Sequence, residues 1–186
     1  MQTKEELRYS LKRQAKQFPP SHFVLEDAAS VKTLLKSDAY AQCTTLFAFS
    51  PLPSEVDISP VLEDALKHKR LALPRCTGDK LLEFLHVSPG WDKRVSPSRL
   101  GVLEPLGGDV AIPDTHSLIL VPAMAYTTLG ERLGRGKGYY DRFLGAFPAI
   151  PTMGICRSYQ LVDSLPTEVW DVRVREVLCK GVIYHT

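Results

Sequence analysis

The stretch from Leu118 to Arg142 constrains the fold of this chain more than any other. It begins with an apolar run that predicts a buried strand and stops at Pro122. From Tyr139 onward, apolar residues recur at helical spacing, which predicts a helix that buries Tyr140. Four glycines and three cations lie in the loop between them: Gly130, Gly134, Gly136, Gly138, Arg132, Arg135 and Lys137.

A strand, a loop of this composition and a helix start together make a site for an anion. Glycines let backbone N–H groups approach a ligand, and the helix N-terminus adds partial positive charge. The loop therefore predicts phosphate binding, and the alternative is a solvated turn. A P-loop would need Ser or Thr where Gly138 stands, and the dinucleotide fingerprint would need glycine at Tyr139, so neither common motif applies.

Helix-like and strand-like segments alternate along the rest of the chain. Thr3 and Glu6 form a capping box that predicts a helix over 3–17, and Ser59 is a candidate cap for another helix. A further helix is expected over 21–36, and strands are expected over 43–49, 71–74, 81–87, 151–156 and 177–184. This alternation predicts a single α/β domain over residues 1–186, with helices on both faces of the sheet. The looser segment 88–116 is either a flap over a site or an irregular connection.

Charge and composition exclude several classes of protein. The net charge of +2 is too small for wholesale attraction to nucleic acid or membranes. The first 14 residues lack the apolar core of a signal peptide, and no apolar run approaches the roughly 20 residues that span a bilayer. Four scattered cysteines suggest buried, reduced thiols. We therefore expect a cytoplasmic monomer without nucleic-acid or membrane partners.

Few residues outside the loop suggest chemistry. The histidines lack zinc-ligand spacing, and no G-x-S-x-G elbow is present. Asp141 at the helix start and Asp171 in a turn after Trp170 are candidate Mg²⁺ ligands, although each is also an ordinary position for a structural acid. Lys4 and Arg8 share one helix face, which by itself indicates only a solvated basic flank.

The motif ERLGRGKGYYDRFL, preceded by LILVPAMAY, closely resembles the signature of the 5-formyltetrahydrofolate cyclo-ligase family. The resemblance extends over nearly the whole chain and rests on further segments in the same order. These segments are Lys4 and Arg8, Ser54-Glu55-Val56, Leu103-Glu104-Pro105, and the tail that contains Gln160, Leu165-Pro166 and Asp171. The resemblance implies a three-layer α/β/α sandwich around a mostly parallel sheet.

The resemblance also implies roles for individual residues. ATP would contact Lys4, Arg8 and the loop residues Arg132, Leu133, Gly134, Arg135, Gly136, Lys137, Gly138, Tyr139 and Tyr140. The folate would contact Glu55, Arg135, Gly136, Lys137, Gly138 and Tyr139, with Arg135 and Lys137 as the catalytic cations. Asp141 and Asp171 would hold Mg²⁺.

Two segments depart from the family pattern. After the central strand the family usually has Gly-x-x-Phe-Asp, and this chain has Ala123, Tyr126 and Thr127 in those places. Four residues after Asp171, where the family often has a second acid, the chain has Arg175.

The reaction implied by the resemblance suits a phosphate loop. ATP would phosphorylate the formyl oxygen of 5-formyltetrahydrofolate, the nitrogen at position 10 would close the ring, and phosphate would leave. Such a reaction needs positioning and charge neutralisation, not a protein nucleophile. Two other functions would fit the same loop: a kinase acting on a small-molecule hydroxyl, and a module that binds single-stranded RNA.

Overall fold

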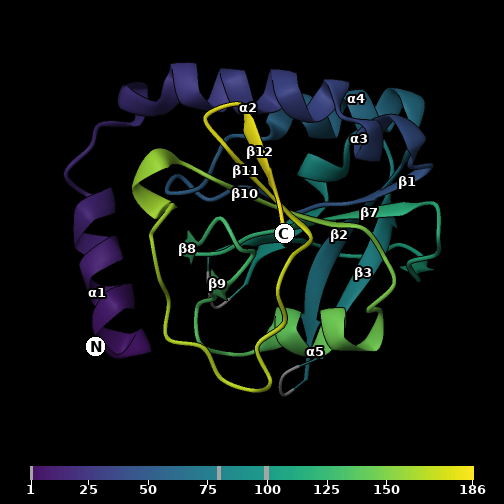
Figure 1. The fold of residues 1–186 in the computed structure, drawn as a ribbon. Coiled ribbons are helices and arrows are strands. Elements are labelled where there is room, and N and C mark those ends of the chain that lie inside the picture. The colour runs from purple at the N-terminus through teal and green to yellow at the C-terminus, as the bar shows by residue number, and fades with distance from the viewer. Residues whose placement is uncertain (1, 79–80, 99–100) are drawn as a thin grey trace.

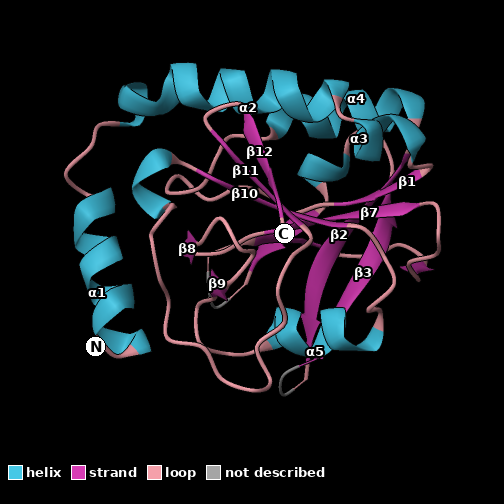
Figure 2. Ribbon diagram, viewed as in Figure 1, coloured by secondary structure: helices cyan, strands magenta, loops and turns pink. Residues whose placement is uncertain are grey.

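The computed structural model describes residues 2–78, 81–98 and 101–186, and its centre is an eight-stranded sheet (Figures 1 and 2). The strand order is β12-β11-β10-β7-β1-β2-β3-β6. The strands are β1 (Thr45–Phe47), β2 (Arg70–Thr77), β3 (Leu81–Val87), β6 (Val110–Ala111), β7 (Ser117–Val121), β10 (Thr152–Cys156), β11 (Glu176–Cys179) and β12 (Val182–His185). The five strands from β11 to β2 are parallel, and the strands at the two edges are antiparallel. The expected mostly parallel sheet is confirmed.

Helices cover both faces of the sheet. Helices α2 (Val24–Lys36), α3 (Asp38–Gln42) and α4 (Ser59–His68) lie on one face, and α5 (Tyr139–Ala146) lies on the other (Figure 1). Successive strand residues point to opposite faces, so Leu118 and Leu120 join the core under α2 and α4. Ile119 and Val121 join the second core, which packs against α5. This arrangement confirms the three-layer α/β/α class.

Helix α1 (Lys4–Ala15) lies beside these layers and begins with the expected capping box between Thr3 and Glu6 (Figure 1). Its buried residue Leu11 packs in a third apolar cluster with Met124, Leu133 and Leu165. That contact places α1 against the strand–loop–helix segment, although the two are more than 100 residues apart in sequence.

The remaining elements are short. The segment 88–116 contains a two-stranded sheet of β4 (Val95–Pro97) and β5 (Leu103–Pro105), besides β6, and is therefore a partly structured connection. Strands β8 (Ala125–Tyr126) and β9 (Arg132–Leu133) form a ladder within the glycine-rich loop. Single-turn 3₁₀ helices lie at Pro20–Phe23, Trp91–Lys93 and Ser158–Gln160 in the described part of the chain.

Two details of the sequence-based prediction are wrong. The expected strand over 177–184 is a hairpin of β11 and β12, because Lys180 and Gly181 both adopt positive φ and reverse the chain. Ser59 does not cap α4. It is the first helical residue, and the carboxylate of Asp57 accepts its backbone N–H at 3.0 Å.

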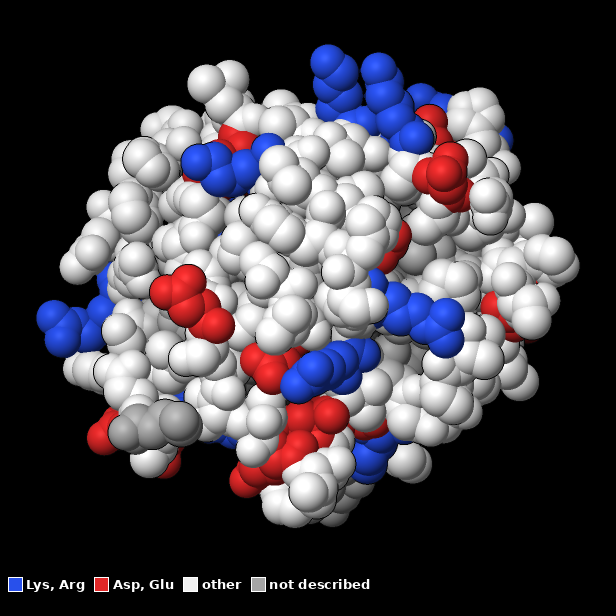
Figure 3. All heavy atoms as spheres, in the orientation of Figure 1, with Lys and Arg blue, Asp and Glu red and all other residues white. Residues whose placement is uncertain are grey.

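No helix among the described residues has both the length and the apolar character needed to cross a membrane. On the face drawn in Figure 3, the basic and acidic side chains of the described residues are interspersed and form no large area of one sign.

Gly130 lies in the loop that follows the central strand β7, and a substitution there tests how tightly this loop is packed. Its φ is +77°, and a Cβ atom would lie 2.2 Å from the backbone oxygen of Val174. We expect Gly130→Ala to lower the free energy of unfolding by about 2–4 kcal/mol, because positive φ and a backbone clash add. Gly145→Ala in α5 is the matched control, since nothing lies within 4 Å of its Cβ position and the change should stabilise the helix slightly. Chemical denaturation measures both, and equal stabilities would contradict the expectation.

Candidate active site

A cavity of about 680 Å³ opens where parallel strands β1 and β7 end. From β1 the chain crosses through α4 to β2 on one side, and from β7 it crosses through α5 to β10 on the other. Such a switch point is where open α/β sheets place ligands, because the loops diverge and leave a crevice. Phe49 and Ser50 after β1 and Pro122 and Ala123 after β7 line this crevice.

The glycine-rich loop forms one wall, and the backbone shape explains two of its glycines. Gly136 and Gly138 have φ of +97° and +65°, which side chains rarely tolerate. Cations lie directly against both, since Cβ atoms there would be 3.4 Å from the Arg8 guanidinium and 2.9 Å from that of Arg142. Gly138 is also the N-cap of α5, so the helix N-terminus faces the cavity.

Helix α1 supplies two cations to the cavity, beside the glycine-rich loop. Lys4 Nζ lies 2.6 Å from Asp171 and 2.7 Å from Glu168, and Arg8 donates through Nε to the Gly134 carbonyl oxygen at 2.8 Å. Burial disfavours the charged amine, but the hydrogen bonds with Asp171 and Glu168 outweigh it and raise the pKa of Lys4, so the ammonium form is retained. The predicted pair Lys4 and Arg8 therefore does more than form a solvated flank, because both residues line the cavity.

Two further ion pairs fix the loop. Arg135 donates to Glu55 at 2.9 Å, and Glu55 also accepts the backbone N–H of Leu52 at 3.0 Å. Arg132 pairs with Asp141, and both are held by Val172, whose carbonyl oxygen accepts from Arg132 and whose N–H donates to Asp141. Each ATP- and folate-binding residue expected from the sequence lines this one cavity.

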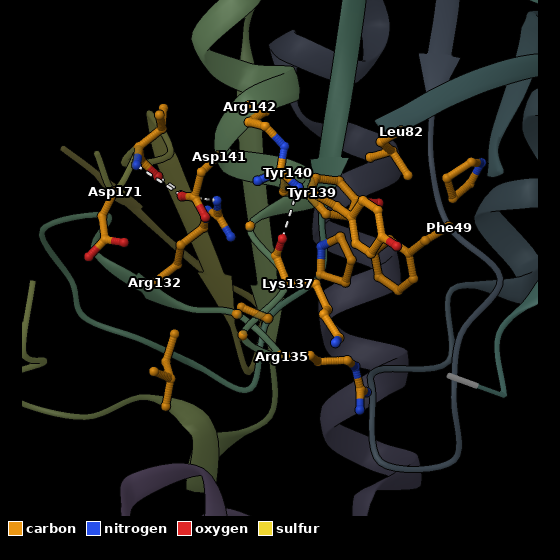
Figure 4. Close-up of a pocket in the computed structure, with 18 of the residues that line it drawn as sticks. Phe49, Leu82, Arg132, Arg135, Lys137, Tyr139, Tyr140, Asp141, Arg142 and Asp171 are labelled. Atoms are coloured by element: carbon orange, nitrogen blue, oxygen red, sulfur yellow. Dashed lines mark hydrogen bonds and ion pairs between the residues drawn. The ribbon is translucent and has the colours of Figure 1, made fainter. Parts of the chain in front are cut away.

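The cavity has a charged side and an aromatic side. Figure 4 shows Arg132, Asp141 and Asp171 on one side of the loop, and Phe49, Leu82 and the two tyrosines on the other. Such a division suits a ligand that combines a charged group with flat rings.

The two carboxylates proposed to bind Mg²⁺, those of Asp141 and Asp171, line the cavity, and in each only one oxygen accepts hydrogen bonds from the described residues. Asp141 uses Oδ1 for Arg132 and Val172, and Asp171 uses Oδ2 for Lys4 and Glu168. The second oxygens receive no hydrogen bond from the described residues. No group of three or more potential ligands gathers in the described part of the chain. The set therefore fits a cation that takes most of its ligands from phosphate and water, as Mg²⁺ does.

Cys76 is a lining residue that the sequence did not indicate. The other cysteines are buried as expected, but Cys76 is half-buried and lies between Glu104 and Tyr139. Burial, reinforced by the charge of Glu104, raises the pKa of this thiol to about 11, so it is protonated at neutral pH and is a poor nucleophile. Alternation along β2 was the available signal, since Pro74 and Cys76 both face the cavity.

The side chains of Tyr139 and Tyr140 point in different directions, as the helical spacing predicts. Tyr139 contacts Cys76 at the aromatic side, and Tyr140 packs against the core under α5. The Tyr140 hydroxyl is buried and has no hydrogen-bond partner among the described residues, and burial raises its pKa well above the ordinary value. A buried donor without a partner costs about 1–3 kcal/mol, which suggests that a ligand supplies the acceptor.

Other lining residues were also missed. Trp170 stands at the rim with 64% of its surface exposed, next to Val169 and Asp171. Its segment is a loop without periodicity, so only its position before Asp171 could have drawn attention to it.

Of the residues that depart from the family pattern, Ala123 lines the cavity, whereas Tyr126, Thr127 and Arg175 do not. Thr127 is buried and organises a turn, because its hydroxyl accepts the backbone N–H groups of Leu129 and Glu131. Arg175 donates to the Pro148 carbonyl oxygen at 2.9 Å.

A family model described as the 5-formyltetrahydrofolate cyclo-ligase family matches residues 1–180. The chain belongs to this family. Cyclo-ligases are ATP-dependent ligases, so the expected class of enzyme is confirmed at the level of the family. The family resemblance drawn from the loop motif is confirmed as well.

Known cyclo-ligases are similar over most of the chain. The mitochondrial 5-formyltetrahydrofolate cyclo-ligase of Arabidopsis thaliana is 30% identical over 76% of the chain and 57% of its own length. The cyclo-ligase of Escherichia coli K12 is 30% identical over 76% of the chain and 80% of its own length. The chain thus spans little more than half of the plant protein.

A solved structure supports the fold. The NMR structure of Aquifex aeolicus 5,10-methenyltetrahydrofolate synthetase is 26% identical, with a TM-score of 0.83 over 98% of this chain and 92% of its own. A synthetase from Mycoplasma pneumoniae has the same fold, with a TM-score of 0.73.

A substitution of Tyr140 tests whether a bound ligand accepts a hydrogen bond from its hydroxyl, which has no partner among the described residues. Tyr140→Phe should leave the free energy of unfolding unchanged or raise it by about 1 kcal/mol, because it removes a buried donor without an acceptor. The same variant should bind ATP more weakly, because phenylalanine lacks the hydroxyl that donates a hydrogen bond. Thermal unfolding with and without ATP measures both, and a loss of stability in the ligand-free variant would contradict the expectation. Tyr9→Phe on the exposed face of α1 is the control.

Proposed function

We propose that the chain converts 5-formyltetrahydrofolate to 5,10-methenyltetrahydrofolate, using ATP and Mg²⁺ and releasing ADP and phosphate. The observation that carries this proposal is the cavity at the β1–β7 switch point, where the cyclo-ligase motif, two cations of α1 and two carboxylates meet. Sequence similarity to named cyclo-ligases supplies the substrate class.

The charged side of the cavity is proposed to hold the triphosphate. Lys4, Arg8 and Lys137 would neutralise its oxygens, and the N-terminus of α5 would add backbone N–H donors. Asp141 and Asp171 would hold Mg²⁺, which supplies charge neutralisation to the phosphates when bound. Lys4, Arg8, Asp141 and Asp171 are each held by a hydrogen bond or an ion pair before a ligand binds, which limits the reorganisation needed when the phosphoryl group moves.

The aromatic side is proposed to hold the folate ring system. Phe49, Leu82 and Tyr139 would pack on its faces, and Glu55 would accept hydrogen bonds from its edge. Arg135 lies between the two sides, paired with Glu55, where it can neutralise the phosphoryl group in transfer.

The proposed reaction has two steps. The formyl oxygen attacks the γ-phosphorus, the bond to ADP breaks, and an iminium phosphate forms at the nitrogen at position 5. The nitrogen at position 10 then attacks the formyl carbon, loses its proton to phosphate or water, and the C–O bond to phosphate breaks. No protein nucleophile takes part, which agrees with the protonated thiol of Cys76.

Growth of the near-ultraviolet band of the methenyl product tests the activity. We expect the band only when 5-formyltetrahydrofolate, Mg²⁺ and ATP are all present. Binding of ATP without growth of the band would support the phosphate site but contradict the proposal that folate is the substrate. Stable phosphate transfer to an added hydroxyl compound would instead identify a kinase, and salt-sensitive RNA binding that ATP does not displace would identify an RNA-binding module.

Arg135→Ala should lower kcat/KM by about 100-fold or more, because one preorganised charge on the transferring group is lost. Lys137→Ala should act in the same direction. Arg173→Ala is the matched control, since Arg173 also pairs with a glutamate, Glu131 at 2.8 Å, but lies outside the cavity. Turnover of Arg135→Ala at the control rate would remove Arg135 from the mechanism, and circular dichroism checks that all variants are folded.

Asp141→Asn and Asp171→Asn should each raise the Mg²⁺ concentration that gives half-maximal ADP binding, by about tenfold. Asparagine retains an oxygen that can accept from Arg132 and Val172 N–H at 141, or from Glu168 N–H at 171, whereas alanine at 141 would leave buried Arg132 without an acceptor. Because Asp141→Asn still removes the charge opposite Arg132, circular dichroism checks that this variant is folded. Calorimetric titration of ADP at several Mg²⁺ concentrations measures this without turnover. Asp163→Asn, exposed and outside the cavity, is the control, and a shift of equal size in it would rule out the proposed ligands.

A further inference from the structure

Another buried ion pair lies outside the cavity, between α2 and the segment that follows β10. Arg157 donates through Nε and Nη2 to the two carboxylate oxygens of Asp27, at 3.0 Å and 2.8 Å. Only 7% of the Arg157 side chain and 11% of the Asp27 side chain are exposed, and neither residue lines the cavity. Because desolvation of two charges offsets much of their attraction, a buried pair is weak evidence for a role in stability alone.

Both partners of this pair also bind the backbone of the segment 53–57, which lies between β1 and α4. Arg157 Nη1 donates to the Pro53 carbonyl oxygen at 2.9 Å, and Asp27 accepts the backbone N–H of Asp57 at 3.1 Å. These contacts lie two residues before and two residues after Glu55. The segment forms no helix or strand, so hydrogen bonds from other parts of the chain largely set its shape.

The segment that carries Arg157 is itself held in place. Glu26 of α2 accepts the backbone N–H and the hydroxyl of Ser158, at 2.9 Å and 2.7 Å. Gln160 accepts the Arg157 backbone N–H at 3.0 Å and donates to the Ala123 carbonyl oxygen after β7 at 3.2 Å. The Arg157 guanidinium therefore extends from a fixed base, from which it can hold the segment 53–57.

Glu55 is the residue of this segment whose carboxylate reaches the cavity. The Tyr159 hydroxyl donates to the carbonyl oxygen of Ser54, directly before it, at 2.9 Å. One Glu55 oxygen accepts from Arg135 at 2.9 Å, and the other accepts the backbone N–H of Leu52 at 3.0 Å. A shift of the segment would therefore move or release Arg135.

We propose that Asp27 and Arg157 are positioning residues of the reaction, which fix the segment 53–57 so that Glu55 holds Arg135 at the transferring phosphoryl group. This inference rests on the proposed function. Neither Asp27 nor Arg157 lines the cavity, so loss of their pair acts on the reaction through Glu55 and Arg135. A misplacement of about 1 Å can lower a rate by about 100-fold, so even a loosened segment should slow the reaction.

The double variant Asp27→Asn/Arg157→Met tests the proposal without leaving a buried charge unpaired. Asparagine retains an acceptor for Asp57 N–H, and methionine fills much of the volume of the arginine, so the protein should unfold cooperatively near the wild-type temperature. We expect kcat to fall about tenfold and the KM for ATP to stay within about twofold, because Lys4 and Arg8 have no contact with the segment among their hydrogen bonds.

Arg157→Lys is a second variant, which keeps the charge but lacks the planar fork that bonds Asp27 and Pro53 at once. It should lower kcat in the same direction. Arg75→Lys is the matched control, since Arg75 also donates to a carboxylate, that of Glu83 at 2.9 Å, and does not line the cavity. The control should retain the wild-type kcat, and a wild-type kcat in both Arg157 variants would overturn the proposal.

A double-mutant cycle with Arg135→Ala separates positioning from general destabilisation. In the Arg135→Ala background, Asp27→Asn/Arg157→Met should lower kcat by less than about twofold, because the group that the pair positions is already absent. An equal, tenfold loss in both backgrounds would show that the pair acts independently of Arg135 and would overturn its positioning role.

Hydrogen exchange in the ligand-free protein tests the same contacts without turnover. The backbone N–H groups of Leu52 and Glu55 should exchange at least about tenfold faster in Asp27→Asn/Arg157→Met, whereas those of β7 should exchange at the wild-type rate. Absence of methenyl product in the wild type would overturn the proposed function. Unchanged exchange at Leu52 and Glu55 would overturn the further inference, whether or not the protein forms product.

Discussion

The rest of the site depends on the pairing of buried Arg132 with Asp141. Arg132 lies on β9, Asp141 lies in the first turn of α5, and Val172 bonds to both from the loop before β11. A charge buried to this extent needs a partner, so these three segments must adopt one arrangement together. That arrangement sets where the glycine-rich loop, the helix N-terminus and Asp171 stand relative to one another.

The sheet supplies the second constraint, and α1 completes the site. Strand β1 lies between β2 and β7, and the crossovers from β1 and β7 leave on opposite faces, which opens the crevice. Leu11 of α1 packs against Leu133 in the loop, which brings Lys4 and Arg8 to the cavity. Residues near both ends of the chain thus meet because of an apolar contact, and the ion pair of Lys4 with Asp171 adds to it.

Periodicity predicted the layers, because alternating and helical apolar spacing follow from burial on one or two faces. The cationic loop could be predicted from composition, because four glycines and three cations interrupt the apolar pattern, but composition alone left a solvated turn as the alternative. The hairpin at Lys180 could not, because a non-glycine residue with φ of 51° interrupts a run that looks continuous. The environment of Cys76 was also beyond the sequence, since it combines Glu104 and Tyr139, which lie far from Cys76 in the chain. The role of Thr127 was likewise beyond the sequence, because it depends on the hydrogen bonds that its hydroxyl accepts from the backbone of Leu129 and Glu131.

The pairing of Lys4 with Asp171 has a consequence for discrimination among ligands. Under the proposed function, a polyphosphate without a cation would draw Lys4 away from Asp171 and leave that carboxylate without its ammonium partner. A divalent cation alone would displace the ammonium group from Asp171 and leave it only Glu168. The metal–nucleotide complex would instead exchange this one ion pair for two, because Lys4 would pair with phosphate and Asp171 with the cation. The ion pair of the ligand-free site would therefore favour the complex over either component by itself.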